Sequence, residues 1–231
     1  MTARIIPALA GCLAVILLAH CGESEAPPES PPPEQPEIVE EPPALEPEPE
    51  IEAKTEPEEM PTAEPERPPR VRMETSKGTI VLELYPDKAP ETVTNFLQYV
   101  DDGFYNETIF HRVIPGFMIQ GGGFEASMQE KSPRDSIQNE SGAMANLRYT
   151  IAMARTPDPH SASAQFFINL TTNQFLDKDQ AADGWGYCVF GKVIEGTDAV
   201  NAIAGVATGN HGGHQNVPVT PVLISSARRD G

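Results

Sequence analysis

Among the residues whose types could carry nucleophilic or metal chemistry, three histidines and two serines of this chain stand close together in two short segments. Ser161 and Ser163 follow His160 closely, but they lack the strand-turn-helix elbow of a serine hydrolase. His211 and His214 are separated by two glycines, and two histidines without further ligands do not make a zinc site. The sequence therefore predicts a glycine-rich loop at residues 211–214, no metal site and no nucleophilic centre.

A different chemistry is indicated by residues 110–122, FHRVIPGFMIQGG, in which an arginine and a glutamine stand among apolar residues. This stretch resembles the cyclophilins, a family of peptidyl-prolyl cis-trans isomerases, in their bacterial form. Three further parts of the chain agree with the resemblance: residues 89–96 (APETVTNF), residues 152–155 with 163–168 (AMAR and SAQFFI) and residues 184–193 (GWGYCVFGKV). The similarity covers roughly residues 71–226.

The resemblance implies a mainly β fold, an eight-stranded antiparallel barrel capped by two α-helices. It also implies that the protein isomerises Xaa-Pro peptide bonds in polypeptides and that this activity needs no cofactor. Rotation about such a bond faces a barrier of about 20 kcal/mol, because resonance gives the C–N bond double-bond character. A nucleophile is not required, since no bond breaks.

Arg112 matches the catalytic arginine of the family. Twisting the peptide bond makes the proline nitrogen pyramidal and frees its lone pair. A guanidinium donor aimed at that nitrogen stabilises the twisted form more than the planar one. An arginine suits this role because it carries its charge at every relevant pH.

The resemblance also assigns the substrate groove. Its proline pocket would be lined by Phe117, Met118, Phe167 and Leu176. Gln120 matches the glutamine that hydrogen-bonds the substrate and steadies the arginine, Ala154 matches a contact to the residue before proline, and Gln165 lies at the same groove. By composition alone, the apolar members of this set would be ordinary core residues.

Three positions of the groove depart from eukaryotic cyclophilins. Phe175 stands in place of a tryptophan and Tyr187 in place of a histidine, as in bacterial members, and both remain candidate substrate contacts. The loss of an indole N–H donor at Phe175 predicts weak cyclosporin binding. Arg155 replaces a frequent asparagine, and the sequence leaves the role of its side chain open.

The elements that must position these residues can be read from periodicity. Alternating apolar residues over 71–84, interrupted by a turn at 75–78, predict a β-hairpin. Pro90 precedes apolar residues at helical spacing, and Gly103 ends that predicted helix. A second short helix is predicted over 198–204, and short apolar runs between polar loops predict further strands.

Composition divides the chain of 231 residues, whose net charge is −18, into three parts. Residues 22–70 hold 15 of the 24 prolines and 16 of the 34 acidic residues, which predicts a disordered, extended linker. Residues 71–231 then form one isomerase domain of about 160 residues, enough for a proper core. The acidic balance argues against a nucleic-acid partner.

The first 21 residues resemble the signal peptide of a bacterial lipoprotein. Arg4 precedes an apolar run over residues 5–19, which is short for a membrane-spanning helix, and Cys21 follows it. The family expects a small residue where this chain has His20, and an uncleaved anchor helix is the alternative. Cys12 fits the local pattern but has too short an apolar run before it.

If Cys21 is lipidated, the expected location is the cell envelope, anchored to the outer membrane and facing the periplasm, because Gly22 rather than aspartate follows. The mature chain then holds one further cysteine, Cys188, which is predicted to be a buried and unreactive thiol. We expect a monomer that isomerises Xaa-Pro bonds of exported polypeptides during folding. Two alternatives are a module that only grips proline segments, and occupation of the groove by the linker's own prolines.

Overall fold

The computed structural model describes residues 67–231, so the predictions for Cys21 and for most of the linker lie outside the described residues. The first strand begins at Arg70, the last residue that the sequence assigned to the linker. Within the described range, no helix is both long and apolar enough to cross a membrane.

The described elements are mostly strands, with two α-helices and one 3-10 turn. In chain order they are β1 (Arg70–Thr75), β2 (Gly78–Leu84), α1 (Pro90–Asp101), β3 (Thr108–Ile109), β4 (Arg112–Ile114), β5 (Met118–Gly121), β6 (Thr150–Met153), β7 (Phe166–Asn169), η1 (Gln174–Leu176), β8 (Val189–Glu195), α2 (Thr197–Ala204), β9 (Thr208–His211), β10 (His214–Pro218) and β11 (Leu223–Arg229).

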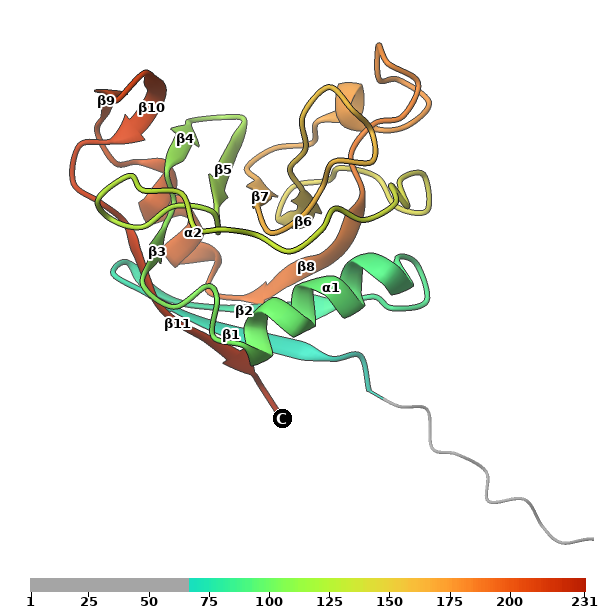
Figure 1. The fold of residues 1–231 in the computed structure, drawn as a ribbon, viewed down its shortest axis with the longest axis horizontal. Coiled ribbons are helices and arrows are strands. Elements are labelled where there is room, and N and C mark those ends of the chain that lie inside the picture. Colours follow the sequence, from blue (N-terminus) through green and yellow to red (C-terminus); the bar gives the residue numbers. More distant parts are fainter. Residues whose placement is uncertain (1–66) are drawn as a thin grey trace, which may run out of the picture. The chain divides into compact units, whose positions relative to one another are not determined.

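Nine of these strands form one antiparallel sheet in the order β3-β11-β1-β2-β8-β6-β7-β5-β4 (Figure 1). The two ends of this order, β3 and β4, are separated in the chain by residues 110–111 alone. Counting β3 and β4 as one interrupted strand gives eight strands in one curled antiparallel sheet. The predicted mainly β barrel with two helices is confirmed.

Helix α1 begins and ends where its sequence predicts. Pro90 occupies the first turn, where a missing N–H costs nothing. At the other end Gly103 adopts a left-handed conformation with φ of +66°, and the amide of Phe104 donates to the carbonyl of Tyr99 at 2.9 Å. This is the Schellman arrangement that favours glycine.

An aromatic cluster ties α1 to the inside of the sheet. The ring of Phe96 lies 5.2 Å from that of Tyr105, 5.8 Å from Phe166 and 5.0 Å from Phe190, measured between centroids. All four side chains are fully buried. Since Phe166 belongs to β7, the core side of that strand is fixed, and its neighbour Phe167 must face the opposite side.

One part of the fold differs from the sequence prediction. Residues 208–218 form a hairpin, β9–β10, where we expected only a loop around the two glycines. These residues are polar and show no alternation of apolar side chains, so periodicity gives no strand signal there. The hairpin turn is made by Gly212 and Gly213, both with positive φ.

Candidate active site

A cavity of about 200 Å³ opens on the outer face of β4, β5 and β7. It is lined by Arg112, Phe117, Met118, Gln120, Ala154, Arg155, Phe167, Leu176 and Tyr187. Eight of the ten site residues predicted within the domain therefore lie around one cavity. Gln165 and Phe175 are the two that do not line it, and Arg155 is the one addition.

Strand register places the polar groups of the site side by side. Arg112 lies directly opposite Gln120 on the neighbouring strand, and Gln120 lies opposite Phe167 on the next. Residues opposite each other in a ladder point to the same face, so all three side chains face the cavity. Nη1 of Arg112 donates to Oε1 of Gln120 at 3.3 Å.

The guanidinium of Arg112 is half-buried, and in the described part of the chain no carboxylate lies within ion-pair distance of it. Its bond to Gln120 uses one of five N–H donors. The remaining donors are available to a bound molecule. The site therefore presents a permanent positive charge beside an apolar surface.

The apolar floor of the cavity is a small cluster separate from the main core. Its buried members are Met118, Ala152, Phe167, Leu176 and Val189. Phe117, Ala154 and Tyr187 pack against this cluster and are partly exposed at the rim. An apolar ring could enter this slot while the polar groups of its chain remain within reach of Arg112.

Gln165 lies one step beyond the cavity, in contact with its polar side. Nε2 of Gln120 donates to Oε1 of Gln165 at 3.0 Å. Gln165 lines a neighbouring cavity of about 420 Å³, which Arg112 and Gln120 also border. The predicted placement of Gln165 along the same groove therefore agrees with the geometry.

Phe175 lies outside the cavity on η1, with 58% of its surface exposed. Its ring stacks on that of Phe117, with centroids 5.6 Å apart and an angle of 28° between the planes. Phe175 thus extends the rim rather than the wall, and it could touch a bound chain only beyond the pocket.

The sequence left the role of Arg155 open, and the structure assigns it a structural one. Its guanidinium is almost fully buried, donates to the carbonyl of Gly186 through Nε at 3.1 Å and pairs with Asp183. It also lies over the ring of Tyr187, 4.5 Å from the centroid. Arg155 therefore holds the loop that carries one wall of the cavity.

Asp183 completes this clamp. Its Oδ1 accepts the backbone N–H groups of Trp185 and Gly186 at 2.9 and 3.1 Å. The hydrogen bond from Arg155, followed by these two backbone donors, lowers the pKa of Asp183 from 3.8 to about 2. The carboxylate is therefore charged throughout the physiological range and keeps the loop closed.

His111 precedes Arg112 and borders the neighbouring cavity of about 420 Å³, but it does not line the cavity of about 200 Å³. Burial lowers its pKa from 6.5 to about 4, helped by the charges of His214 and Arg112, and its Nδ1 has no partner in the described residues. The ring packs on Phe124 with centroids 4.6 Å apart. This agrees with the interpretation of His111 as a packed side chain.

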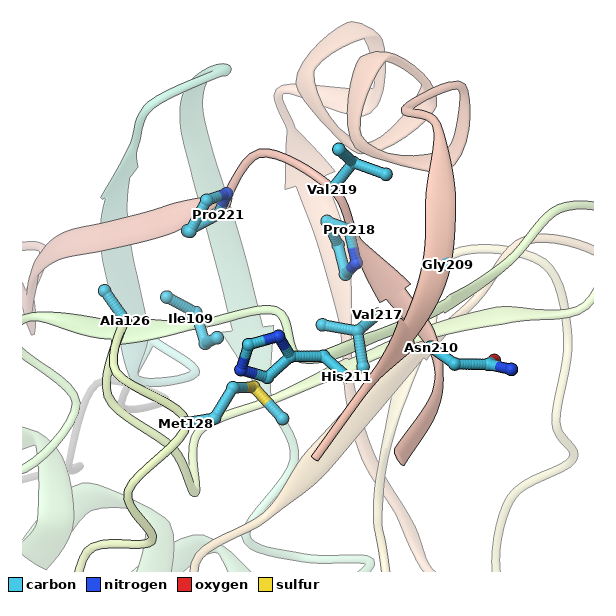
Figure 2. Close-up of a pocket in the computed structure, with 10 residues that line it drawn as sticks. All are labelled: Ile109, Ala126, Met128, Gly209, Asn210, His211, Val217, Pro218, Val219 and Pro221. Atoms are coloured by element: carbon cyan, nitrogen blue, oxygen red, sulfur yellow. The ribbon is translucent and has the colours of Figure 1, made fainter. Parts of the chain in front are cut away.

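The other chemistry-bearing residues of the domain do not converge. His211 lines a separate cavity of about 250 Å³, in which Figure 2 shows its ring beside Met128. His214 packs on Phe124 and borders the cavity of about 420 Å³. No group of three or more metal-ligating side chains gathers within residues 67–231. Cys188 is buried against Thr92, and burial raises its pKa to about 11, which makes it a poor nucleophile.

Comparison with known proteins agrees with this site. Residues 70–229 match the sequence profile of the family described as cyclophilin type peptidyl-prolyl cis-trans isomerase/CLD. Over 158 residues the chain is 56% identical to peptidyl-prolyl cis-trans isomerase B of Escherichia coli K12, covering 68% of this chain and 96% of that protein. Over 160 residues it is 59% identical to peptidyl-prolyl cis-trans isomerase cyp18 of Streptomyces antibioticus, with the same coverage.

A solved structure shares the fold. The crystal structure of a cyclophilin type peptidyl-prolyl cis-trans isomerase of Cryptosporidium parvum, determined in the presence of the dipeptide Ala-Pro, matches with a TM-score of 0.61 and 25% identity. The match covers 70% of this chain and 99% of that one. With the barrel, the guanidinium beside an apolar slot and these relatives together, the chain belongs to the cyclophilin family of peptidyl-prolyl cis-trans isomerases.

Proposed function

We propose that this chain accelerates cis-trans isomerisation of Xaa-Pro peptide bonds in exported polypeptides, from a lipid anchor in the cell envelope. Isomerisation of Xaa-Pro bonds, in support of folding, is the activity of the family to which the chain belongs. The substrate range and the anchor are the parts that this proposal adds. The observation that carries the catalytic proposal is the position of Arg112 beside the apolar floor of the cavity.

The geometry supports a mechanism by differential stabilisation. A proline ring placed against Met118, Phe167 and Leu176 leaves its nitrogen near the mouth of the cavity, where Arg112 stands. Donation of an N–H from the guanidinium to the freed lone pair favours the twisted bond over the planar one. Gln120 holds the guanidinium in place through Oε1.

Arg112→Ala tests this mechanism. Loss of an electrostatic donor of this kind typically costs about 10²–10³ in kcat, and we expect a loss in that range by exchange NMR on an Xaa-Pro peptide. Arg148→Ala is a matched control, because Arg148 is exposed, stacks on Tyr149 and lines no part of the groove. An unchanged rate in Arg112→Ala would contradict the mechanism. Peptide binding without acceleration in the unaltered chain would favour a gripping module.

The anchoring proposal is separate and is supported by sequence alone. The apolar run over residues 5–19 and the cysteine that follows support cleavage before Cys21, acylation of its thiol and retention at the outer membrane facing the periplasm. The acidic, proline-rich residues after it would act as a spacer. A monomer suffices for this arrangement.

Substitution of the cysteine tests the anchor. Cys21→Ser is expected to release the chain into the soluble fraction, while Cys12→Ser leaves it with the membranes. Mass spectrometry of the mature N-terminus then identifies the acyl groups on residue 21. Membrane association that persists in Cys21→Ser would contradict lipidation and favour the uncleaved anchor helix.

A further inference from the structure

A chain of hydrogen bonds leads from the proposed catalytic arginine to a carboxylate at the protein surface. Arg112 donates to Gln120 at 3.3 Å, and Gln120 donates to Gln165 at 3.0 Å. Gln165 in turn donates through Nε2 to Oε1 of Glu130 at 3.3 Å. Glu130 lies in the loop between β5 and β6 and lines neither the cavity of about 200 Å³ nor the neighbouring one.

The chemistry of the two ends gives this chain a direction. An ionised carboxylate only accepts, so Gln165 must turn its amide nitrogen to Glu130 and its oxygen to Gln120. Gln120 then presents its own nitrogen to Gln165 and its oxygen to the cavity. Arg112, which can only donate, meets that oxygen. Both amides are thus oriented by the acceptor at one end and by the donor at the other.

A glycine at position 123 leaves room for this series of hydrogen bonds. A Cβ placed on Gly123 would lie 2.5 Å from Cγ and 2.7 Å from Cδ of Gln165, far inside contact distance. The side chain of Gln165 therefore crosses the backbone at residue 123 and reaches Gln120 on one side and Glu130 on the other. The φ of Gly123 is not positive, so the position needs its small size and not an unusual conformation.

We propose that Glu130 is a positioning residue for Arg112, which acts by setting the orientation of the Gln165 and Gln120 amides. The inference rests on the proposed role of Arg112. Its consequence is that kcat depends on whether the side chain of residue 130 accepts or donates the hydrogen bond to Gln165, and not only on whether that bond is made. A donor at position 130 reverses both amides and turns the nitrogen of Gln120 toward the guanidinium, so that two donors face each other.

Three substitutions of Glu130 separate polarity from mere loss of a contact. Glu130→Gln keeps an acceptor and is expected to retain the kcat of the unaltered chain within about twofold. Glu130→Ala removes the acceptor that orients the two amides but does not reverse them, and it is expected to lower kcat by about threefold. Glu130→Lys reverses the direction and is expected to lower kcat by about tenfold, with KM within about twofold, because Arg112 acts on the twisted state.

Charge alone is controlled by Glu125→Lys, which makes the same change of charge on the same exposed loop. Within residues 67–231, the carboxylate of Glu125 forms no hydrogen bond or ion pair. Its kcat is expected to stay within about 1.5-fold of the unaltered chain. A second readout comes from the side-chain amide signals of Gln120 in ¹⁵N NMR spectra, which should move in Glu130→Lys and stay in place in Glu125→Lys.

The coupling between Glu130 and Arg112 is tested in a Gln165→Ala background, which interrupts the series of hydrogen bonds between them. There, Glu130→Lys and Glu130→Ala are expected to have the same kcat, since no path to Arg112 remains. Equal kcat values for these two variants in the otherwise unaltered chain, or a loss in Glu130→Lys that persists without Gln165, would overturn the proposal. An inactive unaltered chain, or full activity in Arg112→Ala, would instead overturn the proposed function itself.

Discussion

The two sides of the groove are built in different ways. On one side, Arg112, Gln120 and Phe167 stand on β4, β5 and β7, which are neighbours in the curled sheet. On the other side, Leu176 and Tyr187 stand on the 3-10 turn and on the loop that precedes β8. We call these the strand side and the loop side.

The strand side owes its geometry to backbone hydrogen bonds, whereas the loop side depends on a few side chains that hold backbone groups. Arg155 and Asp183 fix the loop around Gly186, and Asp177 accepts the backbone N–H of Asn146 at 2.6 Å. The proposed catalytic group thus stands on the rigid part. We therefore expect the loop side to adapt to different substrate segments while the guanidinium of Arg112 stays in place.

The largest difference is expected between one phenylalanine from each side. Phe167→Ala removes a buried ring from the apolar floor and should lower the free energy of unfolding by about 3–5 kcal/mol. Phe175→Ala removes an exposed ring and should lower it by less than about 0.5 kcal/mol. Urea denaturation measures both, and equal losses would contradict the distinction between the two sides.

The larger pH dependence is expected from His111, which lies directly before the first residue of β4 on the strand side. His111 has a pKa of about 4 in the fold and about 6.5 in the unfolded chain, so between these values the unfolded state binds more protons. Stability should therefore fall as the pH drops from 6.5 to 4, by about 3 kcal/mol in total. In His111→Phe, this part of the decrease in the free energy of unfolding with falling pH should be absent. Parallel pH profiles for the two proteins would show that His111 titrates normally.

The clamp of the loop side is expected to affect binding more than turnover. Arg155→Ala frees the loop that carries Tyr187, and we expect KM to rise by about threefold or more while kcat stays within about twofold. Arg155→Lys should not restore KM, because an ammonium cannot reproduce the planar fork that holds Gly186, Thr156 and Asp183. Full rescue by lysine would mean that charge alone maintains the loop.

The smallest effect is expected from Asp183. Its pKa is lowered to about 2, so its contribution to stability is complete above about pH 4 and is lost as the pH falls through 2. The side chain of Asp183 is 41% exposed and is screened by water, so the contribution is small. The stability gap between the unaltered chain and Asp183→Asn should close between pH 4 and pH 2. Asp179→Asn, at an exposed position of the same loop, makes the same chemical change and serves as the control.

Sequence patterns alone predicted the elements in which each residue's own type decides the local structure. The helix that begins at Pro90 and ends at Gly103 follows from fixed φ at one end and a tolerated positive φ at the other. The barrel and the residues around the cavity followed from the family resemblance, which fixes spatial neighbours that periodicity does not. Neither sequence patterns nor the resemblance predicted the β9–β10 hairpin, because its residues are mostly polar and its pairing depends on two glycines.

Apart from the Arg112–Gln120 pair, which the family resemblance implies, tertiary structure alone decided which polar side chains meet. Arg155 and Asp183 are 28 positions apart, Gln165 and Glu130 35, and Gln120 and Gln165 45. Each of these residues is an ordinary surface type, and nothing in its local sequence marks a partner. Long-range hydrogen bonds form only after the folded sheet has brought strands and loops together. The clamp of the loop side and the hydrogen-bond chain that ends at Glu130 are therefore visible only in the folded domain.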